Sequence, residues 1–230
     1  MRLHRFYIKT DLSGDKITIV DKETINQIKN VFRLRKGDQF MIFNDKKEEV
    51  VATIKNISSD ELSAEVSKKI KNDSEPQNKV NLYLSILKKE NFELVVQKAT
   101  EVGVSKIIPV ISARTVKMNL NIERLQKIAK EAAEQCGRQN IPEISEPIKI
   151  REAFEEAAKN GVTLFFDRYG EDISTWKPGF QVNIFIGAEG GWDEWEVELA
   201  KEKGFHIASL GKLTLRGETA AIIATYLAVK

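Results

Sequence analysis

Two short segments of the chain carry glycines and charged side chains in a pattern that suits a ligand-binding site. The first covers residues 186–191 (Ile-Gly-Ala-Glu-Gly-Gly) and the second covers residues 210–220 (Leu-Gly-Lys-Leu-Thr-Leu-Arg-Gly-Glu-Thr-Ala). Glycine lets a backbone approach a ligand closely, and a helix that opens after each turn would direct free N–H groups into the same space. We therefore expect a site made mostly of main chain, with Glu189, Arg216 and Glu218 as its charged side chains.

The sequence of the two turns excludes two familiar phosphate sites. No Gly-Lys-Ser/Thr follows the glycines, so the segment is not a P-loop, and the dinucleotide spacing Gly-x-Gly-x-x-Gly is also missing. A ligand with a purine and an amino-acid tail is compatible with backbone amides flanked by Leu210, Leu213 and Leu215, although spacing alone does not name it. The alternative is a pair of tight turns that only connect strand to helix.

The composition places the chain among soluble globular proteins. Of its 230 residues, 42% are hydrophobic and 30% are charged, and no apolar run approaches the roughly 20 residues that a membrane span needs. The first residues lack the apolar core of a signal peptide. Cys136 is the single cysteine and is accompanied by two histidines, which argues against a disulfide or a structural zinc site. We expect a cytoplasmic protein with no metal and no membrane association.

Basic side chains concentrate in the first 72 residues, whereas the remainder of the chain is slightly acidic. Basic residues interleaved with aromatics are typical of a nucleic-acid surface. The other interpretation, which the sequence leaves open, is a solvated basic face around ordinary core aromatics. The cluster comprises Arg2, His4, Arg5, Lys9, Lys29, Arg33, Arg35 and Lys36, with Phe6, Tyr7 and Phe32 among them.

The first part of the chain, residues 1–72, has the pattern of a small β-barrel. Short, closely spaced strands are expected at residues 3–8, 16–20, 39–43, 49–57 and 61–70, with one helix at 23–32. Residues 73–79 are polar and contain Pro76, so we interpret them as a linker between two domains.

Residues 80–230 alternate between strands and helices. Strands are expected at 80–87, 106–111, 144–148, 162–166 and 182–186, and helices at 90–102, 121–138, 151–159, 193–203 and 218–229. Asp193 and Glu196 are spaced as in a capping box at the start of the fourth of these helices. The alternation predicts an α/β domain whose mostly parallel sheet is covered by helices on both faces.

Six motifs, in order along the chain, resemble those of the RsmE family, the 16S ribosomal RNA uridine-N3 methyltransferases of the SPOUT superfamily. The two glycine-containing segments are similar to the family's two signature loops. The other matches are His4-Arg5-Phe6-Tyr7, residues 31–38 (Val-Phe-Arg-Leu-Arg-Lys-Gly-Asp), residues 97–104 (Gln-Lys-Ala-Thr-Glu-Val-Gly-Val), and residues 131–138 (Glu-Ala-Ala-Glu-Gln-Cys-Gly-Arg) followed by Ile141-Pro142.

The resemblance implies a trefoil-knotted SPOUT domain that binds S-adenosylmethionine, preceded by a PUA-like barrel that binds RNA, in a homodimer. The implied partner is 16S ribosomal RNA, within a small ribosomal subunit or its precursor. The sequence departs from the family at Ala188, where proline is usual, at Gly217, where threonine or valine is usual, and at Cys136, where serine is common. None of these departures removes a charged residue of the expected site.

The resemblance also assigns roles to individual residues. Arg216 is the candidate for stabilising charge on the uridine, and Glu218 would orient Arg216 or take a proton. Other roles remain open: Glu218 as a carboxylate favoured at a helix N-terminus, Glu189 as a residue that fixes its own loop, and Arg138 as an i,i+4 partner of Glu134.

The expected site therefore has three groups of residues. Arg216 and Glu218 are the catalytic candidates. The residues expected to bind the cofactor are Phe166, Ile186, Gly187, Glu189, Gly190, Gly191, Leu210, Gly211, Leu213, Leu215 and Arg216. Those expected to bind RNA are Arg2, Arg5, Arg33, Arg35, Lys36, Arg114 and Arg138. Arg114 and Arg138 are candidates for RNA or for the substrate pocket, and whether they act in their own subunit or in the partner subunit of a dimer is left open.

Three interpretations of function follow from the sequence. The first is methylation of N3 of a specific uridine in 16S ribosomal RNA. The second is a SPOUT methyltransferase that acts on another RNA or another base. The third is a non-catalytic RNA-binding module whose ligand loops no longer bind a cofactor, and a failure to bind S-adenosylmethionine would favour it.

Overall fold

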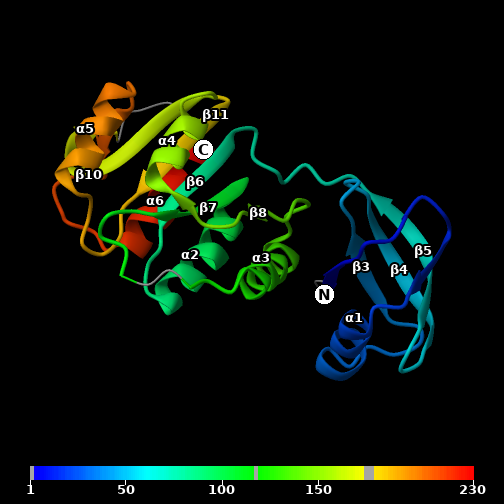
Figure 1. Ribbon diagram of the computed structural model, residues 1–230. Coiled ribbons are helices and arrows are strands. Elements are labelled where there is room, and N and C mark those ends of the chain that lie inside the picture. The colour runs from blue at the N-terminus through cyan, green and yellow to red at the C-terminus, as the bar shows by residue number, and fades with distance from the viewer. Residues whose placement is uncertain (1–2, 117–118, 174–178) are drawn as a thin grey trace. The chain divides into compact units, whose positions relative to one another are not determined.

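The computed structural model describes residues 3–116, 119–173 and 179–230, and the chain divides into two compact units (Figure 1). The first unit comprises Met1–Glu75 together with Ala133–Asn140, and the second comprises Pro76–Ala132 together with Ile141–Lys230. Residues 133–140 thus group with the first unit, although the sequence predicts them within the domain of residues 80–230.

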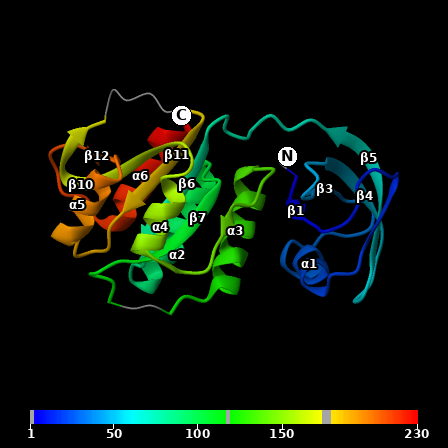
Figure 2. The same ribbon diagram turned by 45° about the horizontal axis from the view of Figure 1, so that its top comes forward.

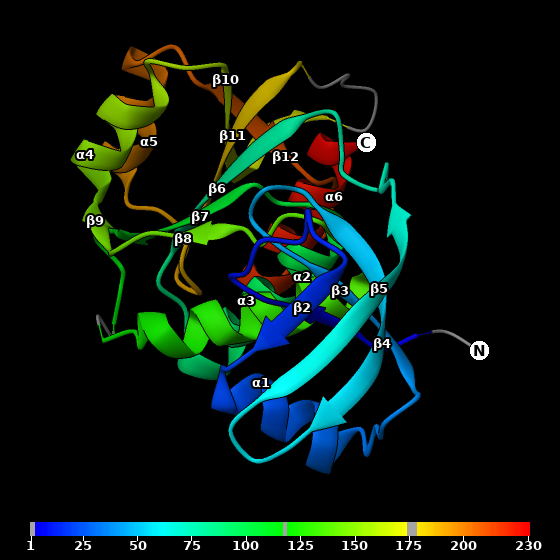
Figure 3. The same cartoon turned by 90° about the vertical axis from the view of Figure 1, so that its right-hand side faces the viewer.

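The first unit is built on a five-stranded sheet (Figure 3). Its strands are β1 (Arg5–Tyr7), β2 (Lys16–Ile19), β3 (Gln39–Phe43), β4 (Glu49–Ile57) and β5 (Leu62–Ile70), in the order β1-β3-β4-β5-β2. β1 pairs with β3 in parallel and the other pairs are antiparallel. The expected strands at 39–43 and 49–57 have the predicted bounds.

One helical segment accompanies this sheet, as expected for residues 23–32. It consists of α1 (Lys22–Asn26), which continues as a π-helical turn, η1 (Gln27–Val31). The side chain of Asp21 accepts a hydrogen bond from the Thr24 N–H at 2.9 Å and so caps the first turn. Ile25 and Ile28 from this segment pack with Phe6 and Phe40 of the sheet in one apolar core.

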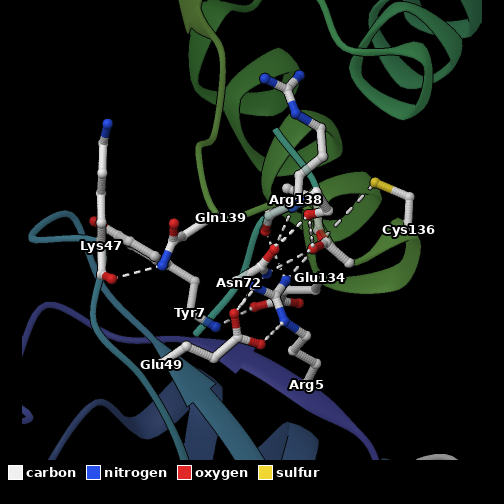
Figure 4. Close-up of polar contacts among 12 residues, drawn as sticks. Arg5, Tyr7, Lys47, Glu49, Asn72, Glu134, Cys136, Arg138 and Gln139 are labelled. Atoms are coloured by element: carbon white, nitrogen blue, oxygen red, sulfur yellow. Dashed lines mark hydrogen bonds and ion pairs between the residues drawn. The ribbon is translucent and has the colours of Figure 1, made fainter. Parts of the chain in front are cut away.

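The buried Arg5 side chain forms an ion pair within the sheet of the first unit and connects that sheet to residues 133–140 of the same unit (Figure 4). The Arg5 guanidinium donates to both carboxylate oxygens of Glu49, at 2.7 and 3.1 Å, and lies over the ring of Phe43. Two further N–H groups donate to the carbonyl oxygens of Ala133 and Arg138, at 3.1 and 2.7 Å. Four of the five N–H groups of this side chain thus have an acceptor within the unit.

Further polar contacts reinforce this attachment (Figure 4). The Asn72 amide donates to Glu49 and to the Gly137 carbonyl, at 2.6 and 3.1 Å. The backbone N–H of Tyr7 donates to the Glu134 carboxylate at 2.9 Å. These bonds join residues that lie far apart in the sequence, which explains why no local pattern predicted them.

The second unit contains a seven-stranded, all-parallel sheet. Its central path runs β12 (His206–Ser209), β10 (Val162–Asp172), β11 (Gln181–Ile186), β6 (Lys79–Ser85), β7 (Lys106–Ile111) and β8 (Glu143–Ile144), and β9 (Ile148–Lys149) also pairs with β7. The helices are α2 (Lys89–Val102), α3 (Ile122–Cys136), α4 (Ile150–Ala157), α5 (Glu194–Glu202) and α6 (Gly217–Val229).

Helices cover both faces of this sheet, as predicted (Figure 2). Successive side chains of a strand point to opposite faces, and β6 shows the consequence. Leu82 and Leu84 pack in one core with Phe92 of α2 and the inner face of α6. Tyr83 packs in a second core with Phe154 of α4 and with residues of α5. Because both faces are buried, the edges of the sheet are left for binding a ligand.

Two details of the second unit differ from the expected elements. The strand expected at 144–148 is split into β8 and β9, which pair with different parts of β7. The strand expected at 162–166 continues to Asp172, but with an interruption, because Phe166 and Glu171 both pair with Ala208 of β12. Residues 167–170 therefore bulge out of the sheet.

The ion pair of Arg5 gives a stability prediction. Removing one partner of a buried pair leaves the other charge buried and uncompensated, which typically costs about 3–5 kcal/mol. We expect Arg5→Met to lower the free energy of unfolding by about 3 kcal/mol in urea denaturation. The matched control is Lys55→Met, because the Lys55–Glu65 pair is exposed, with side-chain exposures of 55% and 50%. This control should cost less than about 1 kcal/mol, and equal losses for the two variants would contradict the assignment.

Candidate active site

The two glycine-containing segments emerge at the same edge of the second unit's sheet. In a parallel sheet all carboxyl ends of the strands lie at one edge. Residues 186–191 follow β11 and residues 210–216 follow β12, while the segments after β6 and β7 leave from the same edge. All the residues expected to bind the cofactor lie on these loops, at the last residue of β11 (Ile186) or, for Phe166, at the point where β10 is interrupted.

The first loop is a tight, ordered turn. The Gly191 N–H donates to the Ala188 carbonyl at 2.8 Å, and Gly191 has a φ of +71°, which favours glycine. The buried side chain of Trp192 donates from its indole nitrogen to the carbonyl of Phe166 at 2.9 Å. β10, at the residue before its interruption, and the loop after β11 are therefore joined directly.

The predicted cap of α5 is present and extends to a second loop. The Glu196 carboxylate accepts the N–H of Asp193 at 2.8 Å with one oxygen and the N–H of Ala113 at 2.8 Å with the other. Arg114 donates to the carbonyl of Gly190 at 2.7 Å and lies 3.7 Å from the Asp193 carboxylate. In this structure Arg114 thus supports the first loop, a contact that the sequence did not suggest.

Glu189 joins the first loop to the start of α2. Its carboxylate accepts the N–H of Lys88 at 2.9 Å and the side-chain amide of Asn91 at 3.5 Å. Burial acts to raise the pKa of Glu189, but these N–H donors outweigh it and hold the pKa below its usual value. The contacts support the expectation that Glu189 fixes its own loop. Lys88 and Asn91 are site residues that sequence reasoning missed.

The second loop places its charged residues in contrasting environments. Its first turn is held by the Gly211 N–H, which donates to the Ser209 hydroxyl at 3.2 Å. The Arg216 side chain is 86% exposed, whereas that of Glu218 is 10% exposed, and the shortest distance between their charged atoms is 4.0 Å. An exposed cation therefore lies beside a buried carboxylate at the start of α6.

The buried carboxylate of Glu218 has an unused acceptor. Among the residues that the structure describes, none donates a hydrogen bond to its Oε2 atom, although that atom is buried. Buried polar atoms nearly always have a partner, and exceptions often mark functional sites. The first turn of a helix favours a negative charge, which accounts for the location of Glu218 but not for its free oxygen. Glu218 is thus the side chain best placed to accept a hydrogen bond from a ligand.

Close packing at Gly217 brings three loops together. A Cβ atom at this position would lie 3.1 Å from the Leu87 side chain and 3.4 Å from the Gly187 carbonyl oxygen. Leu87 follows β6, Gly187 follows β11, and Gly217 opens α6. The glycine that departs from the family pattern therefore allows a close approach between the start of α6 and two neighbouring loops.

The remaining cofactor candidates line the same edge of the sheet. Phe166, which directly precedes the interruption of β10, and Ile186, the last residue of β11, are buried. Leu213 is 81% exposed, and Leu210 and Leu215 are partly buried. The structure thus brings the whole expected set to one edge: Phe166, Ile186, Gly187, Glu189, Gly190, Gly191, Leu210, Gly211, Leu213, Leu215 and Arg216.

The residues expected to bind RNA fall into different settings. Arg33, Arg35 and Lys36 are exposed on the segment between η1 and β3 of the first unit. Arg5 and Arg138 are buried, so their burial argues against phosphate contacts and we leave them out of the RNA surface proposed below. Arg2 lies outside the described residues.

The aromatic residues near this basic segment belong to the core. Phe6 is fully buried, and Phe32 packs against both Phe6 and His4, at ring-centroid distances of 5.4 and 4.2 Å. These rings are therefore occupied by packing within the first unit. Any contribution of this surface to RNA binding would come from its cations.

The buried position of Arg138 depends on Glu75. The Arg138 guanidinium lies 2.9 Å from the Glu75 carboxylate, which also accepts the N–H groups of Gln139 and Asn140 at 2.8 and 2.9 Å. Burial acts to raise the pKa of Glu75, but the arginine and the two N–H donors outweigh it and lower the pKa.

Comparisons with known proteins agree with this architecture. The RNA methyltransferase domain family matches residues 73–229, and the RNA methyltransferase PUA domain family matches residues 20–67. Ribosomal RNA small subunit methyltransferase E of Mesomycoplasma hyopneumoniae is 35% identical over 227 residues, which cover 96% of each chain. The enzyme of the same name from Bacillus subtilis is 31% identical and covers 88% of this chain and 85% of its own length.

Solved structures give the same result. A ribosomal RNA small subunit methyltransferase E from Neisseria gonorrhoeae, bound to S-adenosylmethionine, has a TM-score of 0.90 and 29% identity, and covers 97% of this chain and 95% of its own. A Legionella pneumophila protein in complex with the same cofactor has a TM-score of 0.90 and 28% identity, and the match covers 98% of this chain and 96% of its own.

The fold and the edge loops define the class of protein. The second unit is an α/β RNA methyltransferase domain, and the first unit is PUA-like. More particularly, the chain belongs to the RNA methyltransferase family of ribosomal RNA small subunit methyltransferase E. Among the described residues no helix is long and apolar enough to cross a membrane, and no group of three or more candidate ligand side chains could hold a metal.

The lowered pKa of Glu75 predicts a pH-dependent stability. A carboxyl group whose pKa is lowered by folding stabilises the fold above its unfolded pKa of about 4.3, and this contribution is lost as the pH falls through the lower folded value. We expect Glu75→Gln to reduce the free energy of unfolding by about 1–3 kcal/mol at pH 7. The difference from the wild type should shrink below pH 4 in denaturation curves, and a constant difference from pH 7 to pH 3 would contradict the assignment.

Proposed function

We propose that this protein transfers a methyl group from S-adenosylmethionine to N3 of a uridine in 16S ribosomal RNA. Relatives named for methylation of small-subunit ribosomal RNA cover nearly the whole chain, and two of the similar structures contain S-adenosylmethionine. The observation in this chain that best supports the proposal is the buried, unpartnered oxygen of Glu218 beside the exposed Arg216. The resemblance of the signature loops supports uridine N3 as the position.

The residues of the edge loops fit the cofactor. A Cβ atom added at Gly191 or Gly211 would meet no atom within 4 Å, so both backbones border open space. Leu213 and Leu215 offer apolar contacts for an adenine ring. S-adenosylmethionine carries an ammonium group and a sulfonium group, and the free oxygen of Glu218 is the buried acceptor suited to such a cation.

Bound S-adenosylmethionine supplies an electrophilic methyl group on a positively charged sulfur. For the transfer, uridine N3 would first give up its proton to solvent water, which places negative charge on N3 and on the two carbonyl oxygens of the uracil ring. N3 would then bond to the methyl carbon as the bond from that carbon to sulfur breaks, so that the sulfur leaves as a neutral thioether and the uracil becomes neutral. Arg216 is exposed and permanently charged, and its planar guanidinium suits a paired contact with such oxygens.

Glu218 acts on this step through Arg216 and the cofactor. Its Oε1 atom lies 4.0 Å from the Arg216 guanidinium, which is close enough to bias the orientation of that side chain. The rate then depends on how well the three packed loops position both reactants. Glu189 and Arg114 contribute by holding the first loop, through contacts to Lys88 and Gly190.

The wider assembly is also part of the proposal. We infer a trefoil knot around α6 and a homodimer, in the cytoplasm, that acts on 16S ribosomal RNA in a small ribosomal subunit or its precursor. Within α6, Ala221, Ala224 and Ala228 are buried while Ile223 and Tyr226 are 38% and 49% exposed. An apolar helix with exposed Ile and Tyr side chains supports a subunit contact. Light scattering of the purified protein tests the dimer.

The role of Arg216 gives the first functional prediction. We expect Arg216→Ala to lower kcat for methylation of small-subunit ribosomal RNA by about 100-fold, as the loss of one charge-stabilising donor typically does, with cofactor affinity little changed. The matched control is Lys212→Ala, an exposed cation of the same loop, which should retain activity. Mass spectrometry of the RNA product measures the rate and identifies the methylated base. Full activity of Arg216→Ala would refute the catalytic assignment.

The exposed basic segment of the first unit gives the second functional prediction. If Arg33 and Arg35 contact phosphates, the double variant Arg33→Ala/Arg35→Ala should weaken RNA binding and reduce the slope of log affinity against log salt by about 2. The double variant Lys22→Ala/Lys46→Ala removes the same charge from lysines that pair with Asp60 and Asp11, and it controls for net charge. Filter binding from low to moderate salt measures the RNA affinity of both double variants. Equal slopes for the two would argue against an RNA-binding surface at Arg33 and Arg35.

A further inference from the structure

The interruption in β10 lies at the carboxyl edge of the sheet and is fixed by its packing against β12. Phe166 and Glu171 both pair with Ala208 of β12, so residues 167–170 leave the sheet between them. Gly170 closes this bulge against β12, because a Cβ atom there would lie 2.5 Å from the carbonyl carbon and oxygen of Ala208. Only glycine permits that approach, so the sequence maintains the bulge at this position.

The bulge displays an aromatic ring and a cation to solvent. Tyr169 is 79% exposed, and its N–H donates to the Asp167 carboxylate at 2.9 Å. The Arg168 guanidinium lies 4.3 Å from the centre of the Tyr169 ring and also donates to its hydroxyl group. Among the described residues, no aromatic ring contacts Tyr169. The group that lies over its ring is the Arg168 guanidinium.

Both ends of the bulge are attached to the candidate active site. At its start, the Phe166 carbonyl accepts the indole N–H of Trp192, which ends the first loop. At its end, the Ile173 N–H donates to the carbonyl of Ser209, the residue immediately before the second loop, at 3.3 Å. Arg168 and Tyr169 therefore project from the same edge that carries both loops.

We infer that Tyr169 and Arg168 bind a nucleotide of the substrate RNA next to the base that is methylated. This inference rests on the proposed function. A base that reacts must leave its stack, so its neighbours in the strand lose a stacking partner. An exposed tyrosine ring can replace that partner for any base, and the adjacent guanidinium can pair with a phosphate.

The alternative is that Arg168 and Tyr169 only stack on one another at the surface. Such a pair needs no special backbone, yet here it lies on a bulge that a glycine holds against β12. A pair that only stacks on itself would also not need to lie near the active site. Here the segment is hydrogen-bonded to Trp192, which ends the first loop, and to Ser209, which precedes the second. The position thus favours binding of the strand that carries the target base.

The test compares Tyr169→Leu with Tyr169→Phe and with a control at the opposite edge. Phe180 is also exposed and also has a cation over its ring, Lys79, but it precedes the amino end of β11. Affinity for purified small-subunit ribosomal RNA and the KM for methylation are measured for each variant. We expect Tyr169→Leu to weaken both by about tenfold, as loss of one stacked base does, and Tyr169→Phe and Phe180→Leu to behave like the wild type.

Two other measurements separate the possible failures. Calorimetry should show unchanged affinity for S-adenosylmethionine in every variant, and light scattering an unchanged oligomeric state. If Tyr169→Leu binds RNA like the wild type, or if it changes the oligomeric state, the inference is wrong. If the wild type binds RNA through Tyr169 but methylates nothing, the inference stands and the proposed function fails.

Discussion

The parallel register of the second unit's sheet is the constraint on which the rest of the structure depends. Because helices bury both faces of β6 and its neighbours, the carboxyl edge of the strands is where loops can gather around a ligand. The loops that follow β11 and β12 leave from this edge, and Gly217 allows the start of α6 to pack between Leu87 and Gly187. A site composed from segments far apart in the sequence is thus a consequence of strand order.

Within that frame, most polar side chains at the edge position the main chain. Glu189, Arg114 and Glu196 hold loops by accepting from or donating to backbone groups. Glu218 and Arg216 differ, because one keeps a buried oxygen without a donor and the other is exposed. This division separates the residues that maintain the site from the two that are suited to act on substrate and cofactor.

Much of this arrangement could be predicted from local patterns, and the exceptions have physical reasons. Alternating and apolar runs gave the bounds of β3, β4 and β7, and the spacing of Asp193 and Glu196 predicted the cap of α5. The attachment of residues 133–140 to the first unit depends on the pairing of Arg5 with Glu49 and with carbonyls more than 120 positions away, which no local pattern encodes. The bulge at 167–170 was missed because its residues resemble an ordinary strand end.

The resemblance of the loops suggested the cofactor, whereas the buried oxygen of Glu218 and the close approach at Gly217 required coordinates. The central claim is that these packed loops form a site for S-adenosylmethionine. Calorimetric titration of the folded protein with S-adenosylmethionine tests it most directly. The account predicts saturable binding with micromolar or tighter affinity in the absence of RNA. No heat of binding and no cofactor-induced rise in Tm, from a protein shown to be folded, would contradict it.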